Sequence, residues 1–215
     1  MHHRLATRRI TGLAGLVVAI LFGAGNALWA FEQPEAGASG REIVAFYAGT
    51  SSRIVAGGSI SLVGAAVFIL FASGVRATLC EHEQDDLLAN TAFGGALLVA
   101  AAGLGAETIN MAAALRASDG QLTSGLGQAL FEISYVLGYN AAGVGIGLIL
   151  LAVAAVALRA RALLPRSLAL ALLVVGLAFL TPLCRFLLGP SVLLLFVVSV
   201  QILRVQVPEV AVKAA

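Results

Sequence analysis

Long apolar stretches alternate along this chain with short polar ones, a pattern that predicts a series of membrane-crossing helices. A helix needs about 20 mainly apolar residues to cross the hydrocarbon of a bilayer. Residues 167–204 are too long for one span, so we divide them near Thr181–Arg185, where the apolar run is interrupted. The six predicted spans are residues 10–31, 54–79, 87–115, 126–158, 167–183 and 186–204.

The polar segment 32–53 separates the first two spans. Within it, Ser39-Gly40-Arg41-Glu42 has the spacing of a capping box, in which the serine and the glutamate satisfy the free amides at a helix start. The apolar face of IVAFYAG follows directly. We therefore predict that loop 32–53 is extracytoplasmic and contains a short amphipathic helix lying on or near the membrane surface.

Composition supports a membrane protein. The chain has 215 residues, of which 60% are hydrophobic and only 11% charged, whereas soluble domains carry about 25% charged residues. A transmembrane β-barrel would need segments that alternate between apolar and polar residues, and the apolar runs here are continuous. The predicted fold is all-α: one integral membrane domain, 1–215, built as a polytopic transmembrane helical bundle of about six spans.

The basic start MHHRLATRR followed by an apolar core also fits a signal peptide. The apolar core is long, however, and Leu28 stands where cleavage would need a small residue. We therefore predict that the first span is an uncleaved anchor.

Basic residues predict the orientation, because cytoplasmic loops are enriched in Lys and Arg. With the N-terminus inside, nine of the 13 basic residues lie on the inner side and four on the outer side, which predicts a plasma-membrane protein with both termini in the cytoplasm. The inner residues are Arg4, Arg8, Arg9, Arg76, Arg159, Arg161, Arg166, Arg204 and Lys213, and the outer ones are Arg41, Arg53, Arg116 and Arg185. Basic residues beside spans are typical of membrane orientation, so no nucleic-acid partner is predicted.

Two glutamates and an arginine interrupt or border apolar runs, namely Glu107 in GAETINM, Glu132 in ALFEISYVLGYN and Arg185 in LTPLCRFLLGP. At about 1.5 Å per residue and a hydrocarbon core of about 30 Å, Glu107 lies at the outer edge of the third span. Glu132 lies at or beyond the same boundary, and Arg185 lies in the outer hairpin. Asn26, near the end of the first span, is at a similar level.

Spacing groups these residues into polar stripes. Glu107 and Asn110 share one helix face, as do Glu132, Tyr135 and Tyr139, with Asn140 beside them. Because an exposed charge inside the membrane costs a few kcal/mol, such stripes tend to face the bundle interior. One interpretation is an outward-open ligand-binding pocket, in which Arg185 counters one or both carboxylates. The alternative is two interfacial glutamates in water and a structural salt bridge. The predicted ligand-binding residues are Glu107, Asn110, Glu132, Tyr135, Tyr139, Asn140, Arg185 and Asn26.

Other motifs favour structural roles. The pair Gly143 and Gly147, and the groups Gly57-Gly58 with Gly64 and Gly94-Gly95 with Gly103, permit close helix packing. The same glycine-rich faces also offer a route to a homo-oligomer. Trp29 and Phe31 are expected in the outer aromatic belt.

No metal site or cofactor is predicted. The loop containing Cys80, His82, Glu83 and Asp86 is more typical of a solvated acidic loop than of a metal site. Cys80 and Cys184 fall on opposite faces of the membrane, so no disulfide is expected between them.

The stretches EIVAFYAGTSSRIVAGGSISLVGAAVFILFASGVRATL, AFGGALLVAAAGL and RARALLPRSLALALLVVGLAFLTPL resemble a broad group of uncharacterised actinobacterial multi-pass membrane proteins. The resemblance covers most of the chain after Glu32. Its marks are Phe46-Tyr47-Ala48 before the second span and Leu163-Leu164-Pro165-Arg166 before the fifth, the latter departing slightly from the usual form. It implies a domain of unknown function and no catalytic residue.

Three functions remain open. The favoured one is a non-enzymatic bundle that binds a lipid, another apolar molecule or a partner protein at the outer leaflet. The second is a membrane-embedded isomerase or cyclase acting on an isoprenoid, with Glu107 or Glu132 as catalytic proton donor and Tyr135 or Tyr139 steadying a cation. The third is a transporter or oligomeric channel. Nearly all residues in the inner halves of spans two to four are Ala, Val, Leu or Gly, which argues against a water-filled path through one chain.

Overall fold

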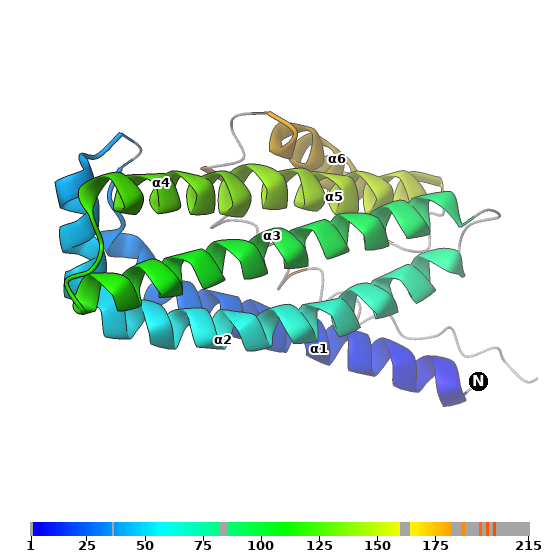
Figure 1. Cartoon of the computed structure of the whole chain (residues 1–215). Coiled ribbons are helices and arrows are strands. Elements are labelled where there is room, and N and C mark those ends of the chain that lie inside the picture. Colours follow the sequence, from blue (N-terminus) through cyan, green and yellow to red (C-terminus); the bar gives the residue numbers. More distant parts are fainter. Residues whose placement is uncertain are drawn as a thin grey trace, which may run out of the picture.

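The helices run side by side along one long axis (Figure 1). The computed structural model describes residues 2–35, 37–81, 86–159 and 164–181, with residues 186, 187, 194, 197 and 200. Within this part of the chain there is no strand, which confirms the all-α class. The elements are α1 His2–Ala27, the 3₁₀ turn η1 Ala30–Glu32, α2 Gly40–Cys80, α3 Leu87–Ser118, α4 Ser124–Tyr135, the π-helix η2 Val136–Ala141, α5 Ala142–Arg159 and α6 Arg166–Phe179.

Within the described residues, four helical stretches are long and apolar enough to cross a membrane, and each contains one of the first four predicted spans. They are Arg9–Glu32, Gly40–Cys80, Leu87–Ser118 and Ser124–Arg159, the last made of α4, η2 and α5. They indicate a membrane protein. The shorter apolar helix α6 covers most of the predicted fifth span. The hairpin at residues 182–185 lies outside the described residues, as does most of the predicted sixth span, so the number six stays a prediction.

The predicted surface helix is not a separate element, because residues 40–53 form the first turns of the continuous helix α2. The capping box is present: the Ser39 side chain accepts from the Glu42 amide, and the Glu42 carboxylate accepts from the Ser39 amide at 2.7 Å. No proline follows to stop the helix. Its apolar face, with Ile43 and Tyr47 fully buried, packs on other helices rather than on lipid.

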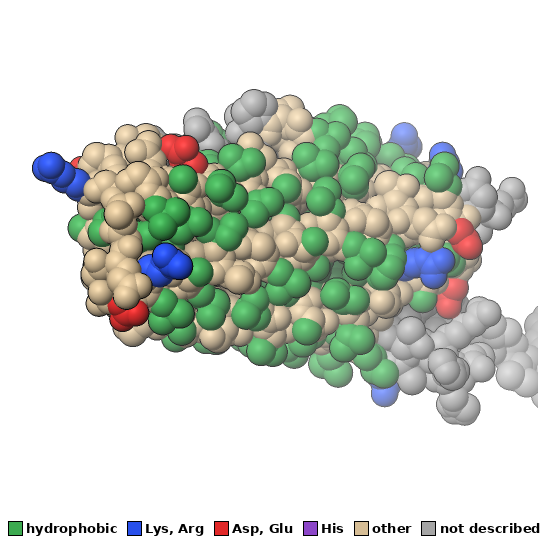
Figure 2. Space-filling model, in the orientation of Figure 1, with side chains coloured by type: hydrophobic (Ala, Val, Ile, Leu, Met, Phe, Trp, Pro, Cys, Tyr) green, Lys and Arg blue, Asp and Glu red, His purple; other side chains and the backbone are tan. Residues whose placement is uncertain are grey.

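The charged residues of the four long helices divide the bundle into a charge-free belt and two charged ends. The charge-free stretches are 10–31, 54–75, 87–106 and 133–158. In Figure 2 charged side chains gather toward the two ends of the visible face, while apolar side chains extend over its middle. At 41 residues and about 1.5 Å per residue, α2 is about twice as long as the hydrocarbon core is thick. We call the part beyond Glu32, Arg53, Glu107 and Glu132, residues 32–53 and 107–132, the cap.

Each long helix packs on the next along the chain, α1 on α2, α2 on α3, α3 on α5 and α5 on α6. In the cap, α4 packs on both α2 and α3. An apolar core lies in the cap and is formed by Ile43, Tyr47, Ala113, Ala114, Ala117, Leu122 and Phe131, with Trp29 and Ile54 joining it from the adjoining ends of the charge-free belt. This core holds together helix ends that extend past the charge-free belt.

Glycines allow the closest approaches between helices, as predicted. A β-carbon at Gly95 would lie 2.6 Å from the carbonyl oxygen of Gly145, and one at Gly147 would lie 3.0 Å from that of Gly176. Backbones therefore meet where α3 packs on α5 and where α5 packs on α6. Gly94 and Gly103, by contrast, face open space. The homo-oligomer through glycine-rich faces stays a prediction.

Candidate functional site

Glu107 occupies the position on α3 where the charge-free stretch ends, and its side chain turns toward α2. A β-carbon added at Gly58 of α2 would lie 3.3 Å from Oε2 of Glu107 and 2.7 Å from the sulfur of Met111. The missing side chain of Gly58 therefore makes the room in which the carboxyl and the thioether lie.

Ser61 lies one turn further along α2. It is 3% exposed, and a β-carbon at Gly25 of α1 would lie 2.5 Å from its Oγ. The hydroxyl also lies close enough to the carboxyl of Glu107 to interact with it, yet their geometry does not make a hydrogen bond for either Oγ or Oε2. Ser61 is thus placed between α1 and α3.

Trp29 also lies against this part of α2, and its position corrects the prediction that it belongs to the outer aromatic belt. It is 5% exposed, so it is buried in the bundle instead of joining an aromatic belt. A β-carbon at Gly57 of α2 would lie 3.1 Å from the indole Nε1, and the ring centroid lies 6.5 Å from that of Phe46. Phe31, which is 90% exposed, faces outward as expected of a belt residue.

These three residues share an unusual property: each has a buried polar atom without a hydrogen-bond partner in the described part of the chain. The atoms are Nε1 of Trp29, Oγ of Ser61 and Oε2 of Glu107. All three lie at one five-residue stretch of α2, Gly57 to Ser61, where two glycines bring α1 and α3 close. A buried polar group left unsatisfied costs about 1–3 kcal/mol. We call Trp29, Ser61 and Glu107 the polar cluster.

Asn110 lies one turn beyond Glu107 on the same helix face, as its spacing predicted. Unlike Glu107, it has a hydrogen-bond partner for its side-chain oxygen. It is 6% exposed, and its Oδ1 accepts a hydrogen bond of 2.8 Å from the hydroxyl of Tyr47. This bond ties α3 to α2 inside the cap. Asn110 therefore contributes to the structure next to the polar cluster without adding an unpaired group to it.

Glu132 lies in different surroundings from Glu107. It is exposed on α4 and accepts a 3.0 Å hydrogen bond from Nε2 of Gln128 on the same helix. Its helical neighbours Tyr135 and Tyr139 are partly buried, and their rings stack with centroids 4.3 Å apart. Tyr139, in η2, also donates to Oε1 of Gln33 at 3.3 Å.

The remaining predicted site residues lie apart from the polar cluster or outside the described residues. Asn26 is exposed and donates to the carbonyl oxygen of Phe22 on its own helix at 2.9 Å. Asn140 is exposed in η2. Arg185 lies outside the described residues, so its predicted role as counter-charge stays a prediction. Of the eight residues, Glu107 and Asn110 are the pair that the structure brings against α2.

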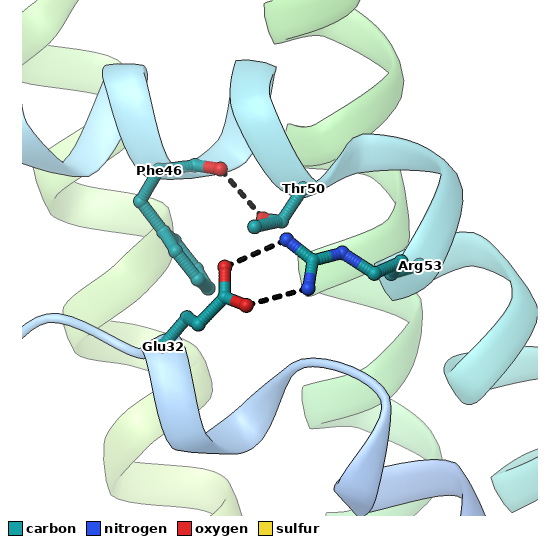
Figure 3. Close-up of polar contacts among 4 residues, drawn as sticks. All are labelled: Glu32, Phe46, Thr50 and Arg53. Atoms are coloured by element: carbon teal, nitrogen blue, oxygen red, sulfur yellow. Dashed lines mark hydrogen bonds and ion pairs between the residues drawn. The ribbon is translucent and has the colours of Figure 1, made fainter.

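Sequence reasoning missed an ion pair at the edge of the cap. Figure 3 shows the guanidinium of Arg53 facing the carboxylate of Glu32 in a two-pronged contact, with N–O distances of 2.5 and 2.6 Å. Beside it, the Thr50 hydroxyl donates to the carbonyl oxygen of Phe46. The ion-paired side chains are about half exposed. Their opposite charges at the two ends of segment 32–53 were the available signal.

A hollow of about 440 Å³ lies on the surface of the cap, lined by Pro34, Glu35, Gly37, Ala38 and Glu42. It contains none of the predicted site residues and none of the polar cluster. Its wall includes Glu42, whose carboxylate is engaged in the capping box. The hollow therefore belongs to the connection that starts α2.

No group of three or more potential metal ligands occurs within the described residues. No protein-family model, curated protein or solved structure matches this chain.

Proposed function

We propose that this chain is a plasma-membrane protein, with both termini in the cytoplasm, that binds the polar head of a membrane amphiphile at the polar cluster. The proposal includes membership of the group of uncharacterised actinobacterial membrane proteins that the sequence resembles. The three unpartnered buried atoms of Trp29, Ser61 and Glu107 carry it.

The level of the cluster supports an amphiphile as ligand. Asp86 and Glu107 border a charge-free stretch of α3, 87–106, whose length of about 30 Å equals the thickness of the hydrocarbon core. Glu107 therefore lies where the apolar chains of one leaflet meet their headgroups. An amphiphile at this level can leave its chain among lipids and direct its head between α1, α2 and α3.

The chemistry of the cluster supports a polar head. The indole N–H of Trp29 only donates, a carboxylate only accepts, and the Ser61 hydroxyl does both. A ligand that offers matching groups would satisfy atoms that the chain leaves unpaired, and each bond would be favourable because the surroundings exclude water. An entirely apolar ligand would leave the same atoms unsatisfied.

A membrane-embedded isomerase or cyclase is the second candidate, and the buried Oε2 of Glu107 is the observation that favours it. In that case Glu107 would donate a proton to an apolar substrate such as an isoprenoid. Glu132, exposed and bonded to Gln128, is the weaker acid candidate. Turnover of a substrate by the wild-type protein and its loss in Glu107→Gln would support catalysis over binding alone. The transporter or channel has no such observation in its favour.

Retention of amphiphiles during purification tests the proposed function. We expect native mass spectrometry and solvent extraction to detect an amphiphile bound to the wild-type protein and to Glu132→Gln, which removes a matched but exposed carboxylate. Glu107→Gln should lower retention by about tenfold, since a hydrogen bond to a charged group contributes roughly 1.5–3 kcal/mol and 1.4 kcal/mol is tenfold in affinity. Equal retention by the two variants would refute binding at the cluster.

A further inference from the structure

We propose that the amphiphile bound at the polar cluster carries a primary ammonium group, with an oxygen acceptor beside it. This inference depends on the proposed function, because it names the class of ligand that the same site takes.

The charges favour a cationic head over an anionic one. Glu107 has no ion-pair partner among the described residues, and its Oε2 has no donor. Arg53, one turn before Gly57 on α2, holds Glu32 through both of its terminal nitrogens and is already neutralised. Among the described residues, a phosphate or carboxylate head would therefore meet a carboxyl with no free guanidinium beside it. An ammonium head would instead supply the positive charge that the carboxyl lacks.

The hydrogen-bonding atoms favour an N–H donor. The carboxyl of Glu107 and the hydroxyl of Ser61 lie near each other, and the oxygens of both can accept. A primary ammonium carries three N–H donors, so it can bond both oxygens at once. A quaternary ammonium has the same charge but no N–H, and a single hydroxyl has one donor for two acceptors. The two oxygens therefore favour a head that carries several N–H donors as well as a positive charge.

The indole of Trp29 adds a requirement for an acceptor. Its Nε1 lies at Gly57 of α2, and Oε2 of Glu107 lies at the next residue, Gly58. Ser61 follows about one helical turn of 5.4 Å further along. The indole N–H therefore requires an acceptor beside the oxygens that the ammonium would bond. An amino alcohol, which carries an ammonium and a hydroxyl oxygen in one head, meets this requirement.

Four probes with the same 12-carbon chain test the inference: dodecylamine, dodecyltrimethylammonium, dodecanol and dodecanoate. Each is titrated into the purified full-length protein while thermal unfolding is followed, because a ligand that binds the folded state raises the melting temperature. The variants are wild type, Glu107→Gln and the exposed-carboxylate control Glu132→Gln. A Ser61→Ala variant removes the second acceptor oxygen without removing a charge, and so tests whether that oxygen contributes to binding.

We expect dodecylamine to stabilise wild type and Glu132→Gln, with an apparent affinity about tenfold weaker for Glu107→Gln. The trimethylammonium and carboxylate probes should show no dependence on Glu107. Glu107-dependent stabilisation by dodecanoate, or equal stabilisation by dodecanol or the trimethylammonium probe, would overturn the ammonium assignment and leave the proposed function standing. If no probe and no retained amphiphile distinguishes Glu107→Gln from Glu132→Gln, both proposals fail.

Discussion

At the scale of single residues, two neighbouring polar side chains on α3 differ in whether they find a hydrogen-bond partner. Asn110 meets the hydroxyl of Tyr47, which extends across from α2. Glu107 meets glycine backbone and a serine that is close to it but not bonded to it. The partner supplied by the facing helix therefore decides which of the two is structural and which is left to bind a ligand.

Removing the Tyr47 hydroxyl should destabilise the folded protein. Tyr47→Phe leaves the buried Oδ1 of Asn110 without its donor, and we expect the free energy of unfolding to fall by about 1–3 kcal/mol. Thermal or denaturant unfolding in detergent measures the loss. Tyr135→Phe, the same substitution at a partly buried ring, serves as control and should lose less. A Tyr47→Phe variant as stable as wild type would show that this hydrogen bond makes no net contribution to the free energy of unfolding.

The residue-level prediction of the site was partly successful for a physical reason. Glu107 attracts notice because a charge at the end of an apolar run is costly. Ser61 and Trp29 give no such signal, since a serine can bond within its own helix and a tryptophan near a span end suits the lipid interface. Their unpaired state depends on which helix packs against them.

At the scale of elements, glycine positions determine how closely helices meet. Gly94 and Gly95 are adjacent on α3, yet a β-carbon at Gly95 would lie 2.6 Å from the Gly145 oxygen of α5, whereas Gly94 faces open space. Both belong to the same motif in the sequence. The direction in which α5 packs therefore makes one glycine necessary and the other replaceable.

Adjacent alanine substitutions test this difference. Gly95→Ala should lower the free energy of unfolding by about 1–3 kcal/mol, because the added methyl group overpacks the contact with α5. Gly94→Ala should leave stability unchanged or raise it slightly, since alanine favours helix by up to about 1 kcal/mol over glycine. Unfolding of the two variants in the same detergent gives the comparison. Equal effects would contradict the close α3–α5 approach.

The ion pair between η1 and α2 should respond to salt. Glu32 and Arg53 are about half exposed, so screening weakens their attraction as ionic strength rises. We expect Arg53→Gln to lower the melting temperature slightly at low salt and to differ less from wild type at high salt. Arg116→Gln, elsewhere in the cap, is the control. A difference that is independent of salt would assign the effect to packing instead.

At the scale of the whole molecule, charged residues of four helices fall into two levels. One level contains Arg9, Arg76, Asp86 and Arg159, and the other contains Glu32, Arg53, Glu107 and Glu132. The second level borders the cap, where α2, α3 and α4 continue together past the charge-free belt. The proposed orientation puts the cap outside the cell.

Labelling of cysteines in intact cells tests that orientation. In a Cys184→Ser background, a membrane-impermeant thiol reagent should label Gly120→Cys, in the α3–α4 turn of the cap, without permeabilisation. Cys80, a free thiol at the end of α2, should be labelled only after the membrane is opened. The reverse pattern would place the cap in the cytoplasm.

Elements that depend on local physics could be predicted from the sequence alone. Long charge-free runs require helices because backbone groups have no other partners in lipid, and the capping box at Ser39 and Glu42 set the start of α2. The location of Glu107 at the end of such a run also followed from counting residues. These features need no knowledge of which helices are neighbours.

Which polar groups find a hydrogen-bond partner depends on how the helices pack, and the sequence did not predict it. Residues 40–53 continue into α2 because the cap offers their apolar face a protein surface, a contact made with helices 60 to 90 residues away that periodicity cannot anticipate. The separation of Glu107 from Glu132, and the gathering of Trp29 and Ser61 around Gly57 and Gly58, likewise depend on helix pairing. A hydrogen bond needs a partner within about 3 Å, and that partner is set by packing between distant segments.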